Sequence, residues 1–203
     1  MAAKHIVVIG ASTGGPRVVP ELFAAMPPLP ASIILVQHMP QYINDSLVRA
    51  WRRHTTMTVR IAQTGDCLYP GVILVAPSGW HCRLHNNEQI VLSDDPAVNY
   101  VRPSIDVTMQ SLTRPAPRQC LVGVVLTGMG CDGAAGLTHI KSIGGITMVQ
   151  DLASCAVSSM PAEALKTGHV DYVLPPAQIG RALGQLIGAE ASSSVNPELC
   201  PHP

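Results

Sequence analysis

The chain has 203 residues, 47% of them hydrophobic and 13% charged, which is typical of a folded protein with a sizeable core. Its 13 basic and 13 acidic side chains balance, with no basic stripe, so nucleic acid is not an expected partner. No apolar stretch approaches the length of a membrane span and no signal peptide precedes the first strand, so we expect a cytoplasmic protein without membrane insertion. The six cysteines are irregularly spaced, which favours reduced thiols over disulfides.

The first 53 residues predict a βαβ unit. A short β-branched run at 5–10 indicates a buried parallel strand, and a second such run follows at 32–37. Between them, residues 18–25 predict a helix, with Pro16 suited to its first turn. Another helix is expected over 44–53.

The middle of the chain predicts short strands instead of long alternating elements. Gly, Pro and Asn separate four candidates, at 58–62, 72–76, 80–84 and 89–92. Residues 85–88 read as a hairpin turn, and the four strands fit either a β insertion or an edge of the main sheet. A helix is expected over 104–112, with Ser104 or Pro103 near its start.

In the last part of the chain, from residue 120 on, predicted strands again alternate with predicted helices. Strands are predicted at 120–126, 146–150 and 170–174, and helices at 134–143, 161–166 and 176–187. Together these elements predict an α/β fold, a doubly wound and mainly parallel sheet with helices on both faces and a small antiparallel hairpin region. We expect one domain over 1–188 and a disordered tail over 189–203.

Three strand ends carry polar residues: Ser12 and Asp132 in glycine-rich loops, and His38 in the segment His38-Met39-Pro40. Functional groups of open α/β sheets gather beyond the carboxyl ends of the strands, so these three side chains are expected to meet. A serine becomes a nucleophile when a base lies beside it and a third group holds that base. Taken singly, Ser12 and Asp132 also suit helix N-caps and His38 a capped strand end.

The loops around these residues favour hydrolysis. Gly10 to Gly14 matches G-x-S-x-G, the pattern of a sharp turn under an exposed serine. The order Ser, His, Asp differs from the Ser, acid, His order of α/β-hydrolases. Backbone amides of Gly128, Met129 and Gly130 are candidates for binding an oxyanion.

Two other kinds of site compete with the hydrolase. Gly10, Gly14 and Gly15 could cradle a phosphate, although their spacing matches neither nucleotide-binding pattern, and His38 stands where an acidic residue would bind ribose. His81, Cys82 and His85 lie close together, but a fourth metal ligand is missing from this segment. We therefore expect neither a cofactor nor a metal.

Six motifs occur in an order that resembles the catalytic domain of CheB, the chemotaxis protein-glutamate methylesterase family. They are I-G-A-S-T-G-G-P at 9–16, V-Q-H-M-P at 36–40, A-P at 76–77 followed by His81, R-P-S-I-D at 102–106, L-T-G-M-G-C-D-G at 126–133 and M-P-A-E-A at 160–164. The resemblance covers roughly residues 4 to 187. It implies a serine hydrolase in which Ser12 is the nucleophile, His38 the general base and Asp132 the residue that orients His38. It also implies that Thr13 lines the site and that Met129 supplies an oxyanion-binding amide.

The resemblance further implies a substrate and partners. The substrate would be a glutamate γ-methyl ester on the cytoplasmic domain of a methyl-accepting chemoreceptor, with methanol released, and receptor glutamines could be deamidated. Members of the family usually carry an N-terminal receiver domain, whereas this chain begins at the first catalytic strand, so we expect a standalone form or control by a separate regulatory protein. Two alternatives stay open: the same hydrolase in another signalling system, and a nucleotide-binding regulatory module.

Overall fold

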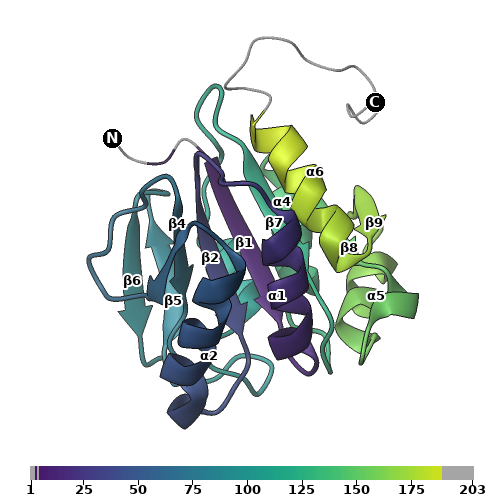
Figure 1. The fold of residues 1–203 in the computed structure, drawn as a ribbon, viewed down its shortest axis with the longest axis horizontal. Helices are drawn as coiled ribbons and strands as arrows, with labels where there is room; N and C mark the ends of the chain where they lie inside the picture. The colour runs from purple at the N-terminus through teal and green to yellow at the C-terminus, as the bar shows by residue number, and fades with distance from the viewer. Residues whose placement is uncertain (1–2, 4, 189–203) are drawn as a thin grey trace.

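The computed structural model describes residue 3 and residues 5–188. Within them, parallel strands form a seven-stranded central sheet in the order β3-β4-β2-β1-β7-β8-β9 (Figure 1). The strands are β1 (His5–Ala11), β2 (Ala31–Gln37), β3 (Thr58–Ile61), β4 (Val72–Val75), β7 (Leu121–Val125), β8 (Ile146–Gln150) and β9 (Tyr172–Leu174). The chain places β2, β3 and β4 on one side of β1, with β4 between β2 and β3, and then returns to add β7, β8 and β9 on the other side. The predicted α/β fold with a parallel sheet is confirmed.

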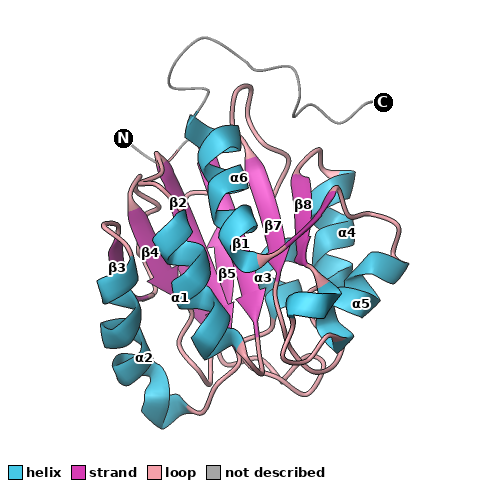
Figure 2. Ribbon diagram, turned by 45° about the vertical axis from the view of Figure 1, so that its right-hand side comes forward, coloured by secondary structure: helices cyan, strands magenta, loops and turns pink. Residues whose placement is uncertain are grey.

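Helices cover both faces of this sheet (Figure 2). One face carries α1 (Gly15–Ala25), α2 (Asn44–Trp51) and α6 (Pro176–Gly188), and the other carries α3 (Ile105–Gln110), α4 (Ala134–Ser142) and α5 (Ser159–Lys166). Successive residues of a strand point to opposite faces, so Val7 and Ile9 pack into one hydrophobic cluster and Ile6 and Val8 into the other. This is why the buried strands are mainly apolar instead of alternating with polar residues.

The four middle strands divide between two sheets. β3 and β4 extend the parallel sheet to its edge, whereas β5 (His81–His85) and β6 (Gln89–Ser93) form a separate antiparallel pair. Their turn places Asn86 and Asn87 in the left-handed region, as expected for a tight hairpin. The sequence did not decide between a β insertion and an edge of the main sheet. The structure contains both, with β3 and β4 at the edge and β5 and β6 as the separate pair.

Element ends differ modestly from the predictions. α1 begins at Gly15, three residues earlier than predicted, and Pro16 lies in its first turn. The helix predicted over 44–53 changes to a 3₁₀ turn after Trp51. The 3₁₀ turns are η1 (Gln41–Ile43), η2 (Arg52–His54) and η3 (Leu152–Ser154). The predicted tail over 189–203 lies outside the described residues, and the boundary at 188 stays a prediction.

The topology decides where the polar loops meet. β1 pairs with β2 on one side and with β7 on the other, so Gly10 lies opposite both Val36 and Val125. The loops that follow these three neighbouring strands therefore open at one edge of the sheet, at the point where the strand order reverses. This is the position at which ligands bind in open α/β sheets.

Candidate active site

His38 and Asp132 are joined by a hydrogen bond. His38 follows β2, and its Nε2 lies 2.9 Å from Asp132 Oδ2, 94 residues further along the chain. The aspartate is acceptor-only when ionised, so Nε2 carries the proton in this arrangement and Nδ1 carries the lone pair. His38 and Asp132, which the sequence expected to meet, are therefore in contact, and their roles as base and orienting carboxylate stay a prediction.

Asp132 is held by more than the histidine. It is 3% exposed and accepts hydrogen bonds from the amides of Ile105 (2.7 Å) and Asp106 (3.1 Å) and from Ser104 Oγ (2.8 Å). Burial alone would raise its pKa, but the bonds from His38, the two amides and Ser104 outweigh burial and hold the pKa of Asp132 below its ordinary value. The carboxylate thus stays charged next to His38.

Ser12 lies beside His38 at the end of β1. The His38 amide donates to the Ala11 carbonyl (2.9 Å), and the Ser12 amide donates to the Thr127 carbonyl (3.0 Å). Gln37 ties the two loops together, because its Nε2 donates both to the Ser12 carbonyl and to the His38 carbonyl, each at 2.9 Å. The nucleophile and base candidates are thereby fixed to each other through one buried amide.

The Ser12 hydroxyl itself makes no hydrogen bond within the part of the chain that the structure describes. Ser12, Thr13 and His38 line a pocket of about 420 Å³ whose remaining wall includes Met39, Ile43 and Leu47. Its size suits a small organic group. The serine therefore shares an open, largely apolar pocket with the histidine, while the link between their side chains is not formed.

Glycines, and not Ser12 or Asp132, form the N-caps of the helices that follow these two residues. The N-cap of α1 is Gly14 and that of α4 is Gly133, each without a side-chain cap bond. Ser12 and Asp132 therefore do not cap the helices that follow them, and Asp132 bonds to the start of α3 instead. Ser104, in contrast, is the N-cap of α3 and accepts from the Val107 amide.

The loop that contains Met129 offers one amide for an oxyanion. The Gly128 amide donates to the Val157 carbonyl and the Gly130 amide to Ser159 Oγ, so these two candidates are engaged. The Met129 amide makes no such bond within the described residues, and its side chain is 75% exposed. Of the three amides that the sequence suggested, only that of Met129 is unengaged.

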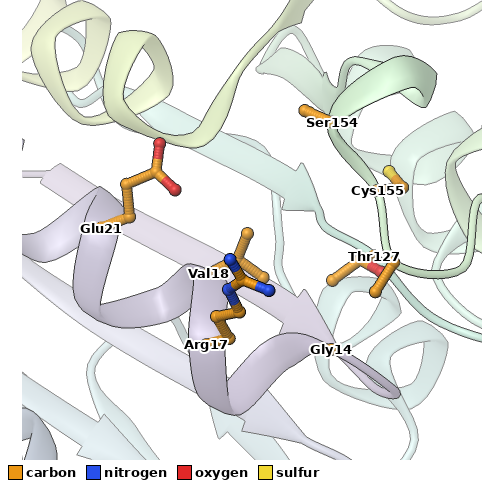
Figure 3. Close-up of a pocket in the computed structure, with 8 residues that line it drawn as sticks. Gly14, Arg17, Val18, Glu21, Thr127, Ser154 and Cys155 are labelled. Atoms are coloured by element: carbon orange, nitrogen blue, oxygen red, sulfur yellow. The ribbon is translucent and has the colours of Figure 1, made fainter.

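A second cleft, of about 270 Å³, lies on the other side of the start of α1. Figure 3 shows Arg17 and Glu21 projecting from α1, with Ser154 and Cys155 on the segment after β8. Burial, and then the charge of Asp151, raise the pKa of the Cys155 thiol to about 11, so it stays protonated and unreactive near neutral pH. This cleft contains no pair of nucleophile and base.

The candidate metal ligands are engaged in other bonds. His81 Nε2 donates to the Pro96 carbonyl (3.0 Å), while Nδ1 accepts from the Ser104 amide (3.2 Å). Burial, and then the charge of Asp66, raise the pKa of Cys82 to about 12, which disfavours the thiolate that a metal would need. Within residues 3 and 5–188, no group of three or more potential ligands converges.

Sequence reasoning missed three contributors: Gln37, Asn99 and Asp106. Gln37 and Asp106 lie inside two of the quoted motifs, V-Q-H-M-P and R-P-S-I-D, but neither spacing reveals what the side chain binds. Asn99 donates to Asp106 Oδ2 (3.0 Å) and, at 3.4 Å, to Asp132 Oδ1. The sequence offered no signal for it.

Comparisons with known proteins bear on the family and the fold. A family model described as CheB methylesterase matches residues 7–183. A protein-glutamate methylesterase/protein-glutamine glutaminase of Symbiobacterium thermophilum is 38% identical over 186 residues, covering 91% of this chain and 51% of that protein. One of Anaeromyxobacter dehalogenans, protein-glutamate methylesterase/protein-glutamine glutaminase 4, is 39% identical over 187 residues, covering 91% and 52%. The chain thus spans about half the length of these curated relatives.

A solved structure supplies the fold-level comparison. The crystal structure of the Thermotoga maritima CheB methylesterase catalytic domain superposes with a TM-score of 0.82 at 35% identity. The match covers 90% of this chain and 98% of that domain.

Proposed function

Because this chain belongs to the CheB methylesterase family, we propose that it is a serine hydrolase that cleaves glutamate γ-methyl esters on a chemoreceptor and releases methanol. The observation that carries the proposal is the hydrogen bond between His38 Nε2 and Asp132 Oδ2 at the edge of the pocket that contains Ser12. The names of the relatives supply the substrate class.

In the proposed mechanism, His38 Nδ1 takes the proton of Ser12 Oγ as the oxygen attacks the ester carbonyl. Asp132, charged and fixed, holds the proton on Nε2 and stabilises the imidazolium that forms. The imidazolium then gives its proton to the departing methoxy group, and methanol leaves. Water attacks the acyl-enzyme with His38 again as base, which releases the glutamate carboxylate and restores Ser12.

Two residues complete the proposed site. The unengaged amide of Met129 is the candidate donor to the tetrahedral oxyanion, and one such donor is typically worth about 10²–10³-fold in rate. Thr13 lines the same pocket as Ser12 and would contact the substrate side chain. Neither role needs a cofactor or a metal, because acid–base catalysis and the oxyanion donor supply the chemistry.

The same acyl-enzyme route accommodates a second activity. The relatives are also named protein-glutamine glutaminases. If the leaving group is ammonia instead of methanol, His38 protonates the amide nitrogen and the later steps are unchanged. We include deamidation of receptor glutamines in the proposal for this reason.

The decisive experiment measures methanol released from a receptor fragment that has been methylated on its glutamates. The wild-type protein is expected to release methanol, and Ser12→Ala is expected to lose at least about 10⁴-fold in rate. A fluorophosphonate probe should label the wild-type serine and leave the variant unlabelled. Full activity in Ser12→Ala would refute the mechanism.

The alternatives make different predictions in the same assay. Hydrolysis of p-nitrophenyl acetate without any release from methylated receptors would favour a hydrolase of another signalling system. Nucleotide binding without fluorophosphonate labelling would favour a regulatory module.

Location and control are further parts of the proposal. The described residues contain no helix with the length and apolarity needed to cross a bilayer. We propose action in the cytoplasm on the cytoplasmic helices of the receptor, with a separate regulatory protein controlling the rate. Unchanged methanol release after adding phosphorylated receiver-domain proteins would count against such control.

A further inference from the structure

Asp106 is a buried carboxylate that the proposed mechanism does not use. It is the second residue of α3 and is 5% exposed. A buried charge requires hydrogen-bond donors, and Asp106 has three. Its Oδ1 accepts from the amides of Gly133 (2.9 Å) and Gly136 (2.7 Å), and its Oδ2 accepts from Asn99 Nδ2 (3.0 Å).

The first turns of α3 and α4 are linked by two reciprocal sets of hydrogen bonds between backbone amides and carboxylates. Asp132, immediately before the N-cap of α4, accepts the Ile105 and Asp106 amides at the start of α3. Asp106, in α3, accepts the Gly133 and Gly136 amides at the start of α4. Each helix start therefore binds the carboxylate that the other helix supplies.

The Gly133 amide is the critical contact because Gly133 directly follows Asp132. Gly133 has a φ of +101°, and a Cβ there would lie 2.6 Å from Val125 Cγ2 and 3.2 Å from Ile105 Cγ2. The backbone at this point is thus confined sterically on two sides and held by Asp106 through its N–H. A carboxylate that holds this amide also sets the direction in which the Asp132 side chain leaves the backbone.

We propose that Asp106 is a positioning residue, whose carboxylate fixes the orientation in which Asp132 meets His38. The inference rests on the proposed function, in which that orientation matters for catalysis. Asn99 assists, because its single amide donates to both carboxylates. Asp106 touches neither the substrate nor the reacting atoms and acts through Asp132 alone.

A purely structural role would make a different prediction. In that case Asp106 would stabilise the start of α4, and its loss would lower stability without changing the folded site. Asp171 offers a matched control, since its Oδ2 accepts from the Thr147 amide (2.9 Å) and hydroxyl (3.0 Å), and it pairs with Lys141 at the far end of α4. Its loss removes comparable bonds away from the site.

The experiment compares Asp106→Ala, Asp106→Asn, Asn99→Ala and Asp171→Ala with the wild type. The readouts are kcat and KM for p-nitrophenyl acetate and for methylated receptor, urea denaturation, and the NMR resonance of the proton on His38 Nε2. We expect Asp106→Ala to lower kcat by about tenfold to a hundredfold, with KM nearly unchanged, and to move the His38 resonance. Asp106→Asn keeps an acceptor for both glycine amides but turns an NH₂ donor toward Asn99 Nδ2, so kcat should fall no further than in Asn99→Ala and the resonance should move less than in Asp106→Ala.

Asp171→Ala should lose stability while its kcat and resonance stay at wild-type values. Asn99 lies on an exposed turn, so Asn99→Ala keeps the proposal testable even if Asp106→Ala fails to fold. We expect about a threefold to tenfold loss of kcat in Asn99→Ala, with a shifted resonance.

Three results would overturn the inference. The first is a folded Asp106→Ala protein whose kcat and His38 resonance match the wild type or change no more than those of Asp171→Ala. The second is an Asn99→Ala protein with both readouts unchanged. The third is an Asp106→Asn protein that folds but loses both. If the wild-type protein cleaves neither ester, the proposed function fails, and the resonance still tests the positioning of Asp132.

Discussion

Ser12 and Asp132 stand at opposite ends of the proposed catalytic triad, and their surroundings in the fold are opposite in kind. Asp132 is 3% exposed and accepts hydrogen bonds from His38 and from three groups at the start of α3. The Ser12 hydroxyl has no bonding partner among residues 3 and 5–188 and faces a pocket of about 420 Å³. A permanent charge must be solvated by the protein at all times, whereas a nucleophile must stay accessible to its substrate.

We call Asp132 with its hydrogen-bond partners the carboxylate end of the site, and Ser12 with its pocket the serine end. The carboxylate end has its hydrogen bonds without substrate, whereas the Ser12 hydroxyl has none among the described residues. Gln37 connects the two, since it holds the carbonyls of Ser12 and His38 with one amide. Its Oε1 is buried without a hydrogen-bond partner among the described residues. An unsatisfied acceptor of this kind costs free energy.

The largest expected effect comes from breaking the carboxylate end. Asp132→Asn removes the charge and can present an amide N–H to His38 Nε2, which then becomes the lone-pair nitrogen. We expect kcat/KM for ester hydrolysis to fall by about 10⁴-fold, because the proton would then sit on the nitrogen that must act as base. Steady-state kinetics measure the effect, with Asp171→Asn as the control carboxylate. Activity within tenfold of the wild type would show that Asp132 does not orient His38.

The connection between the two ends can be broken at Gln37. Gln37→Glu places a buried carboxylate against two carbonyl oxygens, so we expect the free energy of unfolding at pH 8 to fall by about 3–5 kcal/mol. Gln37→Met removes the same bonds without adding charge and should cost about 1–2 kcal/mol. Urea denaturation measures both. Equal losses in the two variants would contradict the geometry that places Nε2 between the carbonyls.

The burial of Asp106 beside Asp132 should make the free energy of unfolding depend on pH. Burial, followed by the charge of Asp132, raises the pKa of Asp106 to about 6, although the amides of Gly136 and Gly133 act in the opposite direction. The folded state therefore binds more protons than the unfolded state between about pH 4 and pH 6. The contribution of Asp106 to stability is fully present below that range and is lost as the pH rises through 6.

Asp106→Asn removes this dependence. Between pH 4 and pH 7, the wild type should lose about 2 kcal/mol of unfolding free energy relative to Asp106→Asn. Parallel urea titrations at the two pH values measure the difference. A constant gap between the two proteins would show that folding does not raise the pKa of Asp106.

The smallest expected effect concerns the serine end. A Cβ on Gly128 would lie 2.7 Å from Ser12 Cβ and 2.2 Å from Met160 Sδ. The flexible side chain of Met160 can turn away from the added methyl group. Ser12 Cβ is attached directly to the backbone, so it can give way only if its loop moves. We therefore expect Gly128→Ala to displace Ser12 and lower kcat/KM by about tenfold to a hundredfold. Gly188→Ala, where the added Cβ meets nothing within 4 Å, is the control. Unchanged kinetics would show that the serine end tolerates movement.

The sequence predicted the parts of the fold that short-range patterns determine. Continuous β-branched runs identified β1, β2 and β7, and the loops after them located Ser12, His38 and Asp132. The position of these loops at one edge followed from the rule for parallel sheets. The family resemblance then ordered the same residues into a proposed mechanism, whose roles stay proposals.

Other features depended on contacts between distant segments. Periodicity could not separate β3 and β4, which join the parallel sheet, from β5 and β6, which form a hairpin, because all four are short and bounded by similar turn residues. Nor could it show that Asp132 bonds to α3 instead of capping α4.

The sequence by itself determined which residue types end which strands, since strand propensity and loop chemistry act over a few neighbouring residues. Tertiary structure alone decided that the start of α3 solvates Asp132 and that Gln37 spans the carbonyls of Ser12 and His38. These bonds join groups up to 28 residues apart, and their geometry depends on how the helices pack on the sheet. Local patterns carry no information about that packing.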